Sequence, residues 1–457
     1  MTSDTEASRS APASRNAGKG TSRPGTGLLT DHYELTMLRA ALDSGAAHRR
    51  TVFEVFARHL PQGRRYGVVA GTGRFLDALA DFRFDPGDLD YLRASRIVDE
   101  PTALYLASYR FSGSIWGYAE GDCYFPGSPI LVVEGSFAEA VVLETLALSV
   151  LNHDCAIGSA AARMITAAGQ RPIIEMGSRR THELAAVAAA RAAYIAGFAA
   201  TSNLRAGLEY GVPTTGTSAH AFTLAHDDER QAFRAQLGIL GTGTTLLIDT
   251  YDVAQAVRTA VEEAGLALGA VRIDSGDLPV VARQVRAQLD SLGATKTRIV
   301  VTSDLDEYSI AGLSAAPVDS YGVGTALVTG SGAPTAALVY KLVARTGTDG
   351  AGPLLPVAKR SPGKPSRGGR KWAARITDPA GTATAELVTT APPPDRPDRR
   401  PLLRQLVRDG EITGAESLTA ARDRHRQAIA ELPAHAQRLS HGSPAIPTIF
   451  EPNPAGR

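Results

Sequence analysis

The feature that most constrains the fold of this 457-residue chain is an alternation of short apolar runs with helical stretches between residues 172 and 321. Such an alternation is typical of a parallel sheet covered by helices. Seven runs predict an α/β domain shaped like an incomplete (β/α) barrel, with an open doubly wound sheet as the alternative. Pro213 in the third run cannot donate to a ladder and is tolerated only near a strand's start. The runs are residues 172–176, 197–200, 212–215, 245–249, 270–274, 298–302 and 318–321.

The segments on either side of this region mix strands and helices. A helix is predicted to begin near Asp31, strands are predicted at 51–56, 113–118 and 130–134, and residues 138–168 form a long apolar helical region. After the alternating region, strands are predicted at 337–345 and 372–377 and a helix at 417–432. The expected divisions are 1–26 as a disordered tail, 27–136 and 334–400 as mixed α+β segments, 137–333 as the barrel-like domain, and 401–457 as a C-terminal helical extension.

The bulk composition excludes several classes of protein. Residues 1–26 hold almost no large apolar side chain, which predicts disorder and no signal peptide. No stretch is apolar for long enough to predict a membrane span. The 48 basic and 47 acidic side chains argue against nucleic-acid binding driven by net charge. Only Cys123 and Cys155 are present, which fits reduced thiols in a cytoplasmic protein.

One basic loop, residues 359–371, is rich in Gly, Pro and Ser and too polar to be core. We interpret it as a solvated hairpin, with a phosphate-contacting loop as the alternative.

Polar residues follow six of the seven apolar runs, where ligands of parallel α/β folds bind. Each segment alone has an ordinary explanation as a helix cap or a turn, but that explanation is improbable for all six. Gly-rich turns suit phosphate, carboxylates suit ribose hydroxyls and Mg²⁺, and arginines suit carboxylate or phosphate. The candidates are Ser178, Arg179, Arg180, Thr217, Ser218, His220, Asp249, Arg272, Asp274, Asp304, Gly322, Gly324 and Thr325.

His220 is the sharpest single candidate, because it follows a Thr-Thr-Gly-Thr-Ser segment where little packing is expected. A neutral imidazole can attack a phosphoryl group and carry it, provided that a partner orients its other nitrogen. If consecutive strands are neighbours, Asp249 is the nearest candidate carboxylate. The plainer alternative is that His220 only hydrogen-bonds a substrate pyrophosphate.

Five motifs, in order along the chain, resemble those of nicotinate phosphoribosyltransferases. They are residues 27–37, 175–181, 216–222, 272–278 and 321–325. The resemblance runs from about Gly27 to Arg375 and implies a type II phosphoribosyltransferase fold, in which the barrel-like domain is joined to a domain built from both chain termini. It implies that nicotinate and phosphoribosyl pyrophosphate give nicotinate mononucleotide and pyrophosphate, with Mg²⁺. It also implies coupled ATP hydrolysis through a phosphohistidine at His220.

The same resemblance implies roles for individual residues. Tyr33 stacks on the pyridine ring, reaching in from the partner subunit of a homodimer with shared active sites. Arg179 and Arg272 hold the nicotinate carboxylate or a nearby phosphate, and Asp274 contacts the ribose. Asp249 orients His220. Three residues cradle the 5′-phosphate, namely Gly322, Gly324 and Thr325, and further contacts are expected from Ser178, Arg180, Thr217, Ser218 and Asp304.

Two alternatives to this function are open. One is the same transfer to nicotinamide, whose amide N–H₂ favours a carboxylate acceptor; Ala221, directly after His220, offers none and so favours nicotinate. The other is a non-catalytic barrel that binds nucleotides. It predicts bland residues where His220, Arg272 and Asp274 stand.

Overall fold

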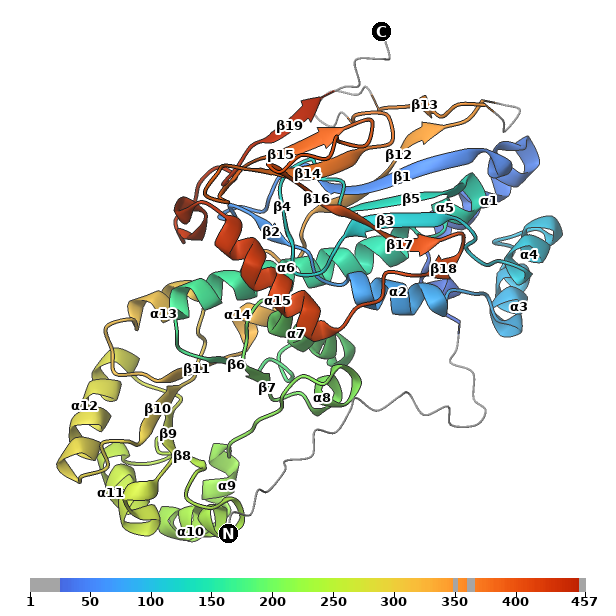
Figure 1. Cartoon of the computed structure of the whole chain (residues 1–457). Coiled ribbons are helices and arrows are strands. Elements are labelled where there is room, and N and C mark those ends of the chain that lie inside the picture. The colour runs from blue at the N-terminus through green and yellow to red at the C-terminus, as the bar shows by residue number, and fades with distance from the viewer. Residues whose placement is uncertain (1–24, 348–351, 360–365, 452–457) are drawn as a thin grey trace, which may run out of the picture.

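The computed structural model describes residues 25–347, 352–359 and 366–451. The chain forms a parallel α/β domain, at the lower left of Figure 1, and a domain of antiparallel and mixed sheets, at the top. The predicted fold class is confirmed. The predicted disordered tail lies outside the described residues except for Gly25 and Thr26, and so does the middle of the basic loop.

The α/β domain is built on a parallel sheet with the strand order β7-β6-β11-β10-β9-β8. The sheet curls into half of a barrel, and α11, α12 and α13 lie on its outer side (Figure 1). The strands are β6 (Ile173–Glu175), β7 (Ala200–Thr201), β8 (Thr245–Leu247), β9 (Ala270–Ile273), β10 (Arg298–Val301) and β11 (Ser320–Val323). The helices are α7 (Glu183–Ile195), α8 (Leu204–Tyr210), α9 (His220–Leu224), α10 (Glu229–Leu240), α11 (Val253–Ala264), α12 (Leu278–Ser291), α13 (Glu307–Gly312) and α14 (Thr325–Val328).

The run predicted as a strand at 212–215 is not one. The amide of Thr201 donates to the Pro213 carbonyl at 2.9 Å, and the amide of Thr215 donates to the Thr201 carbonyl at 3.0 Å. These bonds make a single bridge between Thr201 and Thr214. Because proline has no N–H, the ladder cannot continue through it. The run predicted at 197–200 likewise enters the sheet only at its end, since Gly197 turns the chain with a φ of 120°.

The second domain holds a seven-stranded sheet with the order β13-β12-β1-β5-β3-β17-β18 and a four-stranded sheet with the order β16-β14-β15-β19. Strand β1 pairs with β12 on one side and β5 on the other, so segments from before and after the barrel share one sheet. The strands are β1 (Arg50–Ala57), β2 (Gly67–Val68), β3 (Ser114–Tyr118), β4 (Cys123–Tyr124), β5 (Leu131–Ser136), β12 (Leu338–Arg345), β13 (Leu355–Pro356), β14 (Trp372–Thr377), β15 (Ala383–Thr389), β16 (Arg399–Pro401), β17 (Leu403–Arg408), β18 (Glu411–Ile412) and β19 (Thr448–Glu451). The helices are α1 (His32–Ser44), α2 (Thr72–Ala80), α3 (Pro86–Ala94), α4 (Glu100–Ala107) and α5 (Phe137–Val141).

The segment predicted as a helical extension contains more than the expected helix, α15 (Leu418–Glu431). Strand β17 pairs with β3, β18 pairs with β17, and β19 adds to β15 in parallel. Describing this segment as helical was therefore wrong for its strands. They are only two to six residues long, too short for a clear two-residue alternation.

A 25-residue helix, α6 (Glu144–Ala168), runs through both hydrophobic cores. Leu146 and Leu151 pack in the core of the mixed-sheet domain, whereas Ile157 and Met164 pack in the core of the α/β domain. The stretch 137–168 is long and apolar enough to cross a membrane by length and composition, which the sequence analysis overlooked. Within the structure 67% of its most apolar window is buried, so most of that window is covered by protein.

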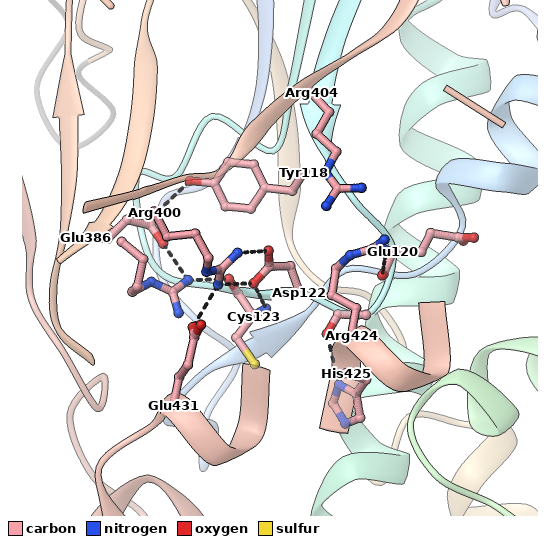
Figure 2. A network of polar contacts seen from close by, with 12 residues as sticks. Tyr118, Glu120, Asp122, Cys123, Glu386, Arg400, Arg404, Arg424, His425 and Glu431 are labelled. Carbon is pink, nitrogen blue, oxygen red and sulfur yellow. Dashed lines mark hydrogen bonds and ion pairs between the residues drawn. The ribbon is translucent and has the colours of Figure 1, made fainter. Parts of the chain in front are cut away.

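A network of polar contacts fastens α15 to the turn between β3 and β4 (Figure 2). Arg400 donates to both carboxylate oxygens of Asp122, at 2.8 and 3.1 Å, and to Glu431 of α15 at 2.8 Å. The Nδ1 atom of His425 lies 3.1 Å from the Gly121 carbonyl oxygen. The C-terminal part of the chain is thus held by charge pairs as well as by strand pairing.

Candidate functional site

The carboxyl ends of β6, β9, β10 and β11 surround an open polar cavity of about 190 Å³. This is the edge of the sheet at which the sequence analysis placed a ligand. Eight of its predicted site residues line the cavity, and they come from four separate segments of the chain. These eight are Arg179, Arg180, Arg272, Asp274, Asp304, Gly322, Gly324 and Thr325; Met176, Thr302 and Ser303 complete the lining.

Arg272 in β9 is held rigidly at this cavity. Its Nε donates to the Thr302 hydroxyl and its Nη1 to the Thr217 hydroxyl, both at 2.9 Å. Its Nη2 donates to Asp274 at 3.1 Å, and Nη1 also reaches the Ser218 carbonyl at 3.3 Å. The residue is only 8% exposed, so the planar guanidinium is fixed before any ligand arrives. Thr217 and Ser218 therefore act on the polar cavity through Arg272, and they also line a second, more apolar cavity beside α9 and α10.

His220, the first residue of α9, lies beside two carboxylates. Its Nε2 is 3.9 Å from an oxygen of Asp249 and 3.9 Å from an oxygen of Asp274, while its Nδ1 is 3.1 Å from the Thr250 hydroxyl. The other Asp249 oxygen accepts from the Asp274 amide at 2.9 Å and from the Ser275 hydroxyl at 2.6 Å.

The Asp249 oxygen that faces His220 is buried and has no hydrogen-bond partner among the described residues. Leaving a buried carboxylate oxygen unpaired costs free energy, so this atom is available to accept a hydrogen bond from a nearby donor. The structure thus brings Asp249 to His220, as the sequence predicted, but at a distance longer than a hydrogen bond.

Arg179 and Arg180 follow β6 and are both exposed at the cavity. Within the described part of the chain neither guanidinium has a hydrogen bond or a carboxylate partner. Ser178 does not line the cavity; its hydroxyl accepts from the Asn203 side-chain amide at 3.0 Å, which ties the arginine turn to the segment after β7. The two arginines are therefore free cations on a fixed turn.

Behind this turn lies Glu175, which belongs to the motif at residues 175–181 but was not among the predicted site residues. Its fully buried carboxylate accepts from the Gly177 amide and from the Thr201 hydroxyl. Burial raises the pKa of this carboxyl group above its ordinary value, and the hydrogen bonds from Thr201 and Gly177 offset that effect only in part. Its location within a strand, next to apolar residues, gave no signal of this role.

The segments after β10 and β11 approach each other closely. A Cβ atom on Gly322 would collide with the side chains of Thr302 and Met176, so the strand requires glycine there. Thr325 donates to Asp304 at 3.3 Å. Ser303 adopts a φ of 115°, which is unusual for a residue with a side chain and costs about 1–3 kcal/mol. Strain of this kind is concentrated at binding sites, and Ser303 lines the cavity.

Glu229, at the start of α10, is a second residue that the sequence analysis missed. Burial, followed by the negative charges of Asp252 and Asp249, raises its pKa to about 7. One of its oxygens is buried without a hydrogen-bond partner among the described residues. In the sequence it looked like an ordinary acidic residue in a first helical turn.

Tyr33 is not brought to the polar cavity of its own chain. It lies on α1, in the mixed-sheet domain, and its side chain is 45% exposed. Burial of part of the ring and the nearby Glu144 raise the pKa of the phenol. Figure 1 shows α1 at the far side of the molecule from β8–β11. The arrangement of the domains therefore separates Tyr33 from the polar cavity of its own chain.

The donor set is compatible with Mg²⁺ held mainly through a substrate. No cluster of three His, Cys, Asp or Glu side chains that could hold a metal exists among the described residues. Mg²⁺ is typically bound by one or two carboxylates together with substrate phosphates. Asp274, which lines the cavity, supplies such a carboxylate.

Fold and site together define a class: an α/β half-barrel protein with a candidate site for an anionic ligand at the carboxyl ends of its strands. Comparison with known proteins narrows this class. Residues 28–152 match the model of the nicotinate phosphoribosyltransferase (NAPRTase) N-terminal domain. Over 446 residues the chain is 60% identical to a nicotinate phosphoribosyltransferase of Mycobacterium tuberculosis, covering 95% of this chain and 98% of that protein. The chain belongs to the nicotinate phosphoribosyltransferase family.

A more distant relative and a solved structure support the same family and fold. A nicotinate phosphoribosyltransferase of Bacillus subtilis is 37% identical over 360 residues, covering 76% of this chain and 73% of that protein. The crystal structure of human nicotinic acid phosphoribosyltransferase has the same fold, with a TM-score of 0.78, 24% identity, and coverage of 93% of this chain and 97% of that chain.

Proposed function

We propose that the protein transfers a phosphoribosyl group from phosphoribosyl pyrophosphate to nicotinate, giving nicotinate mononucleotide and pyrophosphate in NAD biosynthesis. The observation that carries this proposal is the cavity in which two unpaired arginines, the fixed Arg272 and the glycine turn at 322–324 converge. Its positive charge and carboxylates suit a phosphorylated ribose and an aromatic acid. The family relationship supports the same reaction.

For this reaction the protein has to position the two substrates and stabilise the charges that develop. The pyridine nitrogen attacks the anomeric carbon, the bond to the pyrophosphate oxygen breaks, and the ribose gains oxocarbenium character. Arg179 and Arg180 are placed to neutralise anionic groups, and Arg272 to bind a carboxylate or phosphate. Asp274 is placed for a ribose hydroxyl. Mg²⁺, if held by Asp274 together with the substrate's phosphates, would supply further positive charge for the departing pyrophosphate.

The test is a turnover assay with phosphoribosyl pyrophosphate, Mg²⁺ and ATP, offering nicotinate, nicotinamide and quinolinate separately. Nicotinate mononucleotide is the expected product. A site built for charge pairing should lose much of its affinity for the neutral amide. Equal turnover of nicotinamide would contradict the proposed specificity, and binding of phosphoribosyl pyrophosphate without turnover of any acceptor would favour a non-catalytic barrel.

We also propose that ATP hydrolysis is coupled to this transfer through a phosphohistidine at His220. With Nε2–H directed at Asp249, the Nδ1 lone pair attacks the γ-phosphorus of ATP, the bond to the bridging oxygen breaks and ADP leaves. The unpaired oxygen of Asp249 stabilises the positive ring. Water then attacks the phosphorus, the N–P bond breaks, and phosphate leaves with the imidazole restored.

His220→Ala should abolish ATP hydrolysis while leaving weak, ATP-independent synthesis. Radiolabelled γ-phosphate should attach to the wild-type protein in an acid-labile, base-stable form, and Asp249→Asn should slow that labelling. ATPase activity that survives in His220→Ala, with no labelling of the wild type, means that the histidine is only a ligand for the substrate.

A homodimer with shared sites is the third proposal, and the separation of Tyr33 from its own cavity supports it. Tyr33→Ala and His220→Ala subunits should each lack ATP-coupled synthesis, and mixing them should restore part of that activity, because a mixed dimer contains one intact site. A fully active monomer in light scattering would rule this arrangement out.

A further inference from the structure

Two of the segments that line the polar cavity are joined to each other, behind the cavity, by one buried carboxylate. Glu307 is the first residue of α13 and stands three residues after Asp304, on the segment that follows β10. Its carboxylate accepts a hydrogen bond from the Ser331 hydroxyl, on the segment that follows β11 and α14. Glu307 is only 2% exposed and does not itself line the cavity. It can therefore act on a ligand only through these two segments.

Two buried arginines hold Glu307 in place. The Nε of Arg163, on α6, donates to it at 2.9 Å, and the Nη1 of Arg64 donates to the same oxygen at 3.3 Å. Both arginine side chains are at most 7% exposed, and in the described part of the chain neither pairs with another carboxylate. Burial opposes the ionisation of Glu307, but hydrogen bonds from Ser331 and Arg163 outweigh it and hold the pKa below its ordinary value. These four residues are called the Glu307 cluster below.

The same arginines reach other parts of the molecule. Arg163 donates to the Gly63 carbonyl at 3.0 Å and to the Leu439 carbonyl, in the C-terminal segment, at 2.9 Å. Arg64 donates to the Gly330 carbonyl at 2.6 Å, directly before the serine of the cluster. Figure 1 shows α13 against the end of α6, the helix that runs through both cores. The Glu307 cluster therefore ties the two cavity segments to the helix that the domains share.

Both cavity segments need a contact of this kind. Ser303 adopts a φ of 115°, and a strained residue keeps such a conformation only where its surroundings fix it. Helix α14 has four residues, too few to be stable without tertiary contacts. Its end is held by Ser331, whose amide donates to the Ala326 carbonyl at 2.6 Å and whose hydroxyl donates to Glu307. Loss of the contact to Glu307 would let the two segments shift relative to each other.

From these contacts we infer that the Glu307 cluster consists of positioning residues for the phosphorylated substrate. It sets the spacing between the segment of Asp304 and the turn at 322–325, which both line the cavity. Backbone N–H groups of such a turn bind phosphate, and a displacement of about 1 Å can weaken catalysis by up to about 100-fold. Arg179, Arg180 and Arg272 have no bond to the cluster, so their contacts to an anion should remain. The inference rests on the proposed transfer from phosphoribosyl pyrophosphate, because it concerns the same cavity.

Ser331→Ala tests the inference with a small change, because it removes one donor and leaves every charge in place. KM for phosphoribosyl pyrophosphate should rise about tenfold, the effect of one lost hydrogen bond to a charged group. The kcat and the KM for nicotinate should change by less than about twofold. Calorimetric titration with phosphoribosyl pyrophosphate alone should show the same loss of affinity. Glu307→Gln should have a larger effect, and Ser331→Ala decides the matter if Glu307→Gln does not fold.

Ser159→Ala is the matched control. It also removes a single serine hydroxyl, on the same helix as Arg163, where that hydroxyl accepts from the Val68 amide at 2.9 Å and donates to the Cys155 carbonyl at 2.6 Å. The control should be less stable than the wild type, because a buried amide loses its acceptor, but its KM and Kd for phosphoribosyl pyrophosphate should stay normal.

The outcomes separate this inference from the proposed function. A lower thermal midpoint in Ser331→Ala with unchanged KM and Kd, or an equal rise of both constants in Ser159→Ala, would overturn the positioning role. A wild type that binds phosphoribosyl pyrophosphate but forms no mononucleotide would contradict the proposed function, while the comparison of Kd values would still decide the inference. A wild type that does not bind phosphoribosyl pyrophosphate would overturn both.

Discussion

The buried network of the mixed-sheet domain and the polar cavity of the half-barrel use arginine in opposite ways. In the mixed-sheet domain Arg375 is fully buried and donates to Glu386 at 3.0 Å and to the Cys123 carbonyl at 2.7 Å. At the half-barrel Arg179 and Arg180 are exposed and have no partner in the described part of the chain. A buried charge must be paired to be tolerated, whereas a charge that awaits a ligand must be left unpaired. Whether an arginine has a carboxylate partner therefore distinguishes structural arginines from those that bind a ligand.

Arg272 lies between these extremes. It is only 8% exposed and each of its three nitrogens donates a hydrogen bond, yet it lines the polar cavity. Two of its four partners are hydroxyl groups and one is a carbonyl oxygen, so Asp274 is the one carboxylate that offsets its charge within the described part of the chain. The contrast predicts that substitutions in the buried network will cost stability, whereas substitutions around the cavity will cost activity.

The largest effect is expected in the buried network. Glu386→Gln leaves the Arg375 charge without its carboxylate, which should lower the free energy of unfolding by about 3–5 kcal/mol. Tyr118, which donates to Glu386 at 2.8 Å, would also lose part of its partner. Urea unfolding measures the change. A Glu386→Gln protein as stable as the wild type would show that the Arg375–Glu386 pair does not stabilise the fold.

Arg272→Lys should behave in the opposite way. Lysine keeps the charge but cannot reach Thr302, Thr217 and Asp274 together, so we expect kcat/KM for nicotinate to fall by about 100-fold, or roughly 3 kcal/mol. The thermal midpoint should change by less than about 3 °C, since the charge stays paired with Asp274. A large loss of stability with normal kcat/KM in the folded fraction would place Arg272 among the structural arginines.

The sequence predicted the half-barrel well because its signal is repetitive. Each strand of the sheet is a short apolar run. Only the run containing Pro213 was wrongly predicted to be a strand, because proline has no N–H to donate to a ladder. The strands after residue 400 were not predicted, because β17 and β19 are completed by pairing with β3 and β15, far away in the sequence. Such pairing leaves no local pattern.

The candidate site was predictable in part for a related reason. Residues at strand ends, such as Arg272 and Asp274, are marked by their position, and the structure does gather them. Glu175, Thr250 and Glu229 were not assigned, because their importance comes from what they contact and how deeply they are buried. The separation of Tyr33 from the cavity is equally invisible in the sequence, since it depends on how the domains are arranged.

The buried network should also respond to acid. His425, packed near Asp122 and Arg422 with its Nδ1 facing the Gly121 carbonyl, has its pKa lowered by burial to about 4. Below its ordinary pKa of about 6.5 the unfolded chain binds a proton that the folded chain does not, so stability is lost as the pH falls from about 6.5 towards 4. The loss from this residue should reach about 3 kcal/mol.

Urea unfolding between pH 7 and pH 4.5 measures this dependence. His425→Gln should be less stable than the wild type at pH 7, but its stability should fall less steeply with acid. Parallel pH profiles for the two proteins would show that other groups cause the acid sensitivity.

The smallest effect is expected where the two kinds of environment meet, at Glu175. It is buried like the network residues, but it serves the arginine turn at the cavity by accepting from Gly177 and Thr201. In Glu175→Gln one of these acceptors becomes an NH₂ donor, so the turn should loosen while the core stays filled. We expect KM for phosphoribosyl pyrophosphate to rise about tenfold, roughly 1.4 kcal/mol, with kcat changed by less than about twofold. Thr201→Val should reproduce this effect by removing the hydroxyl donor, whereas Thr201→Ser keeps the donor and should restore a normal KM. A lower thermal midpoint in Glu175→Gln with an unchanged KM would mean that the carboxylate stabilises the fold without positioning the arginines.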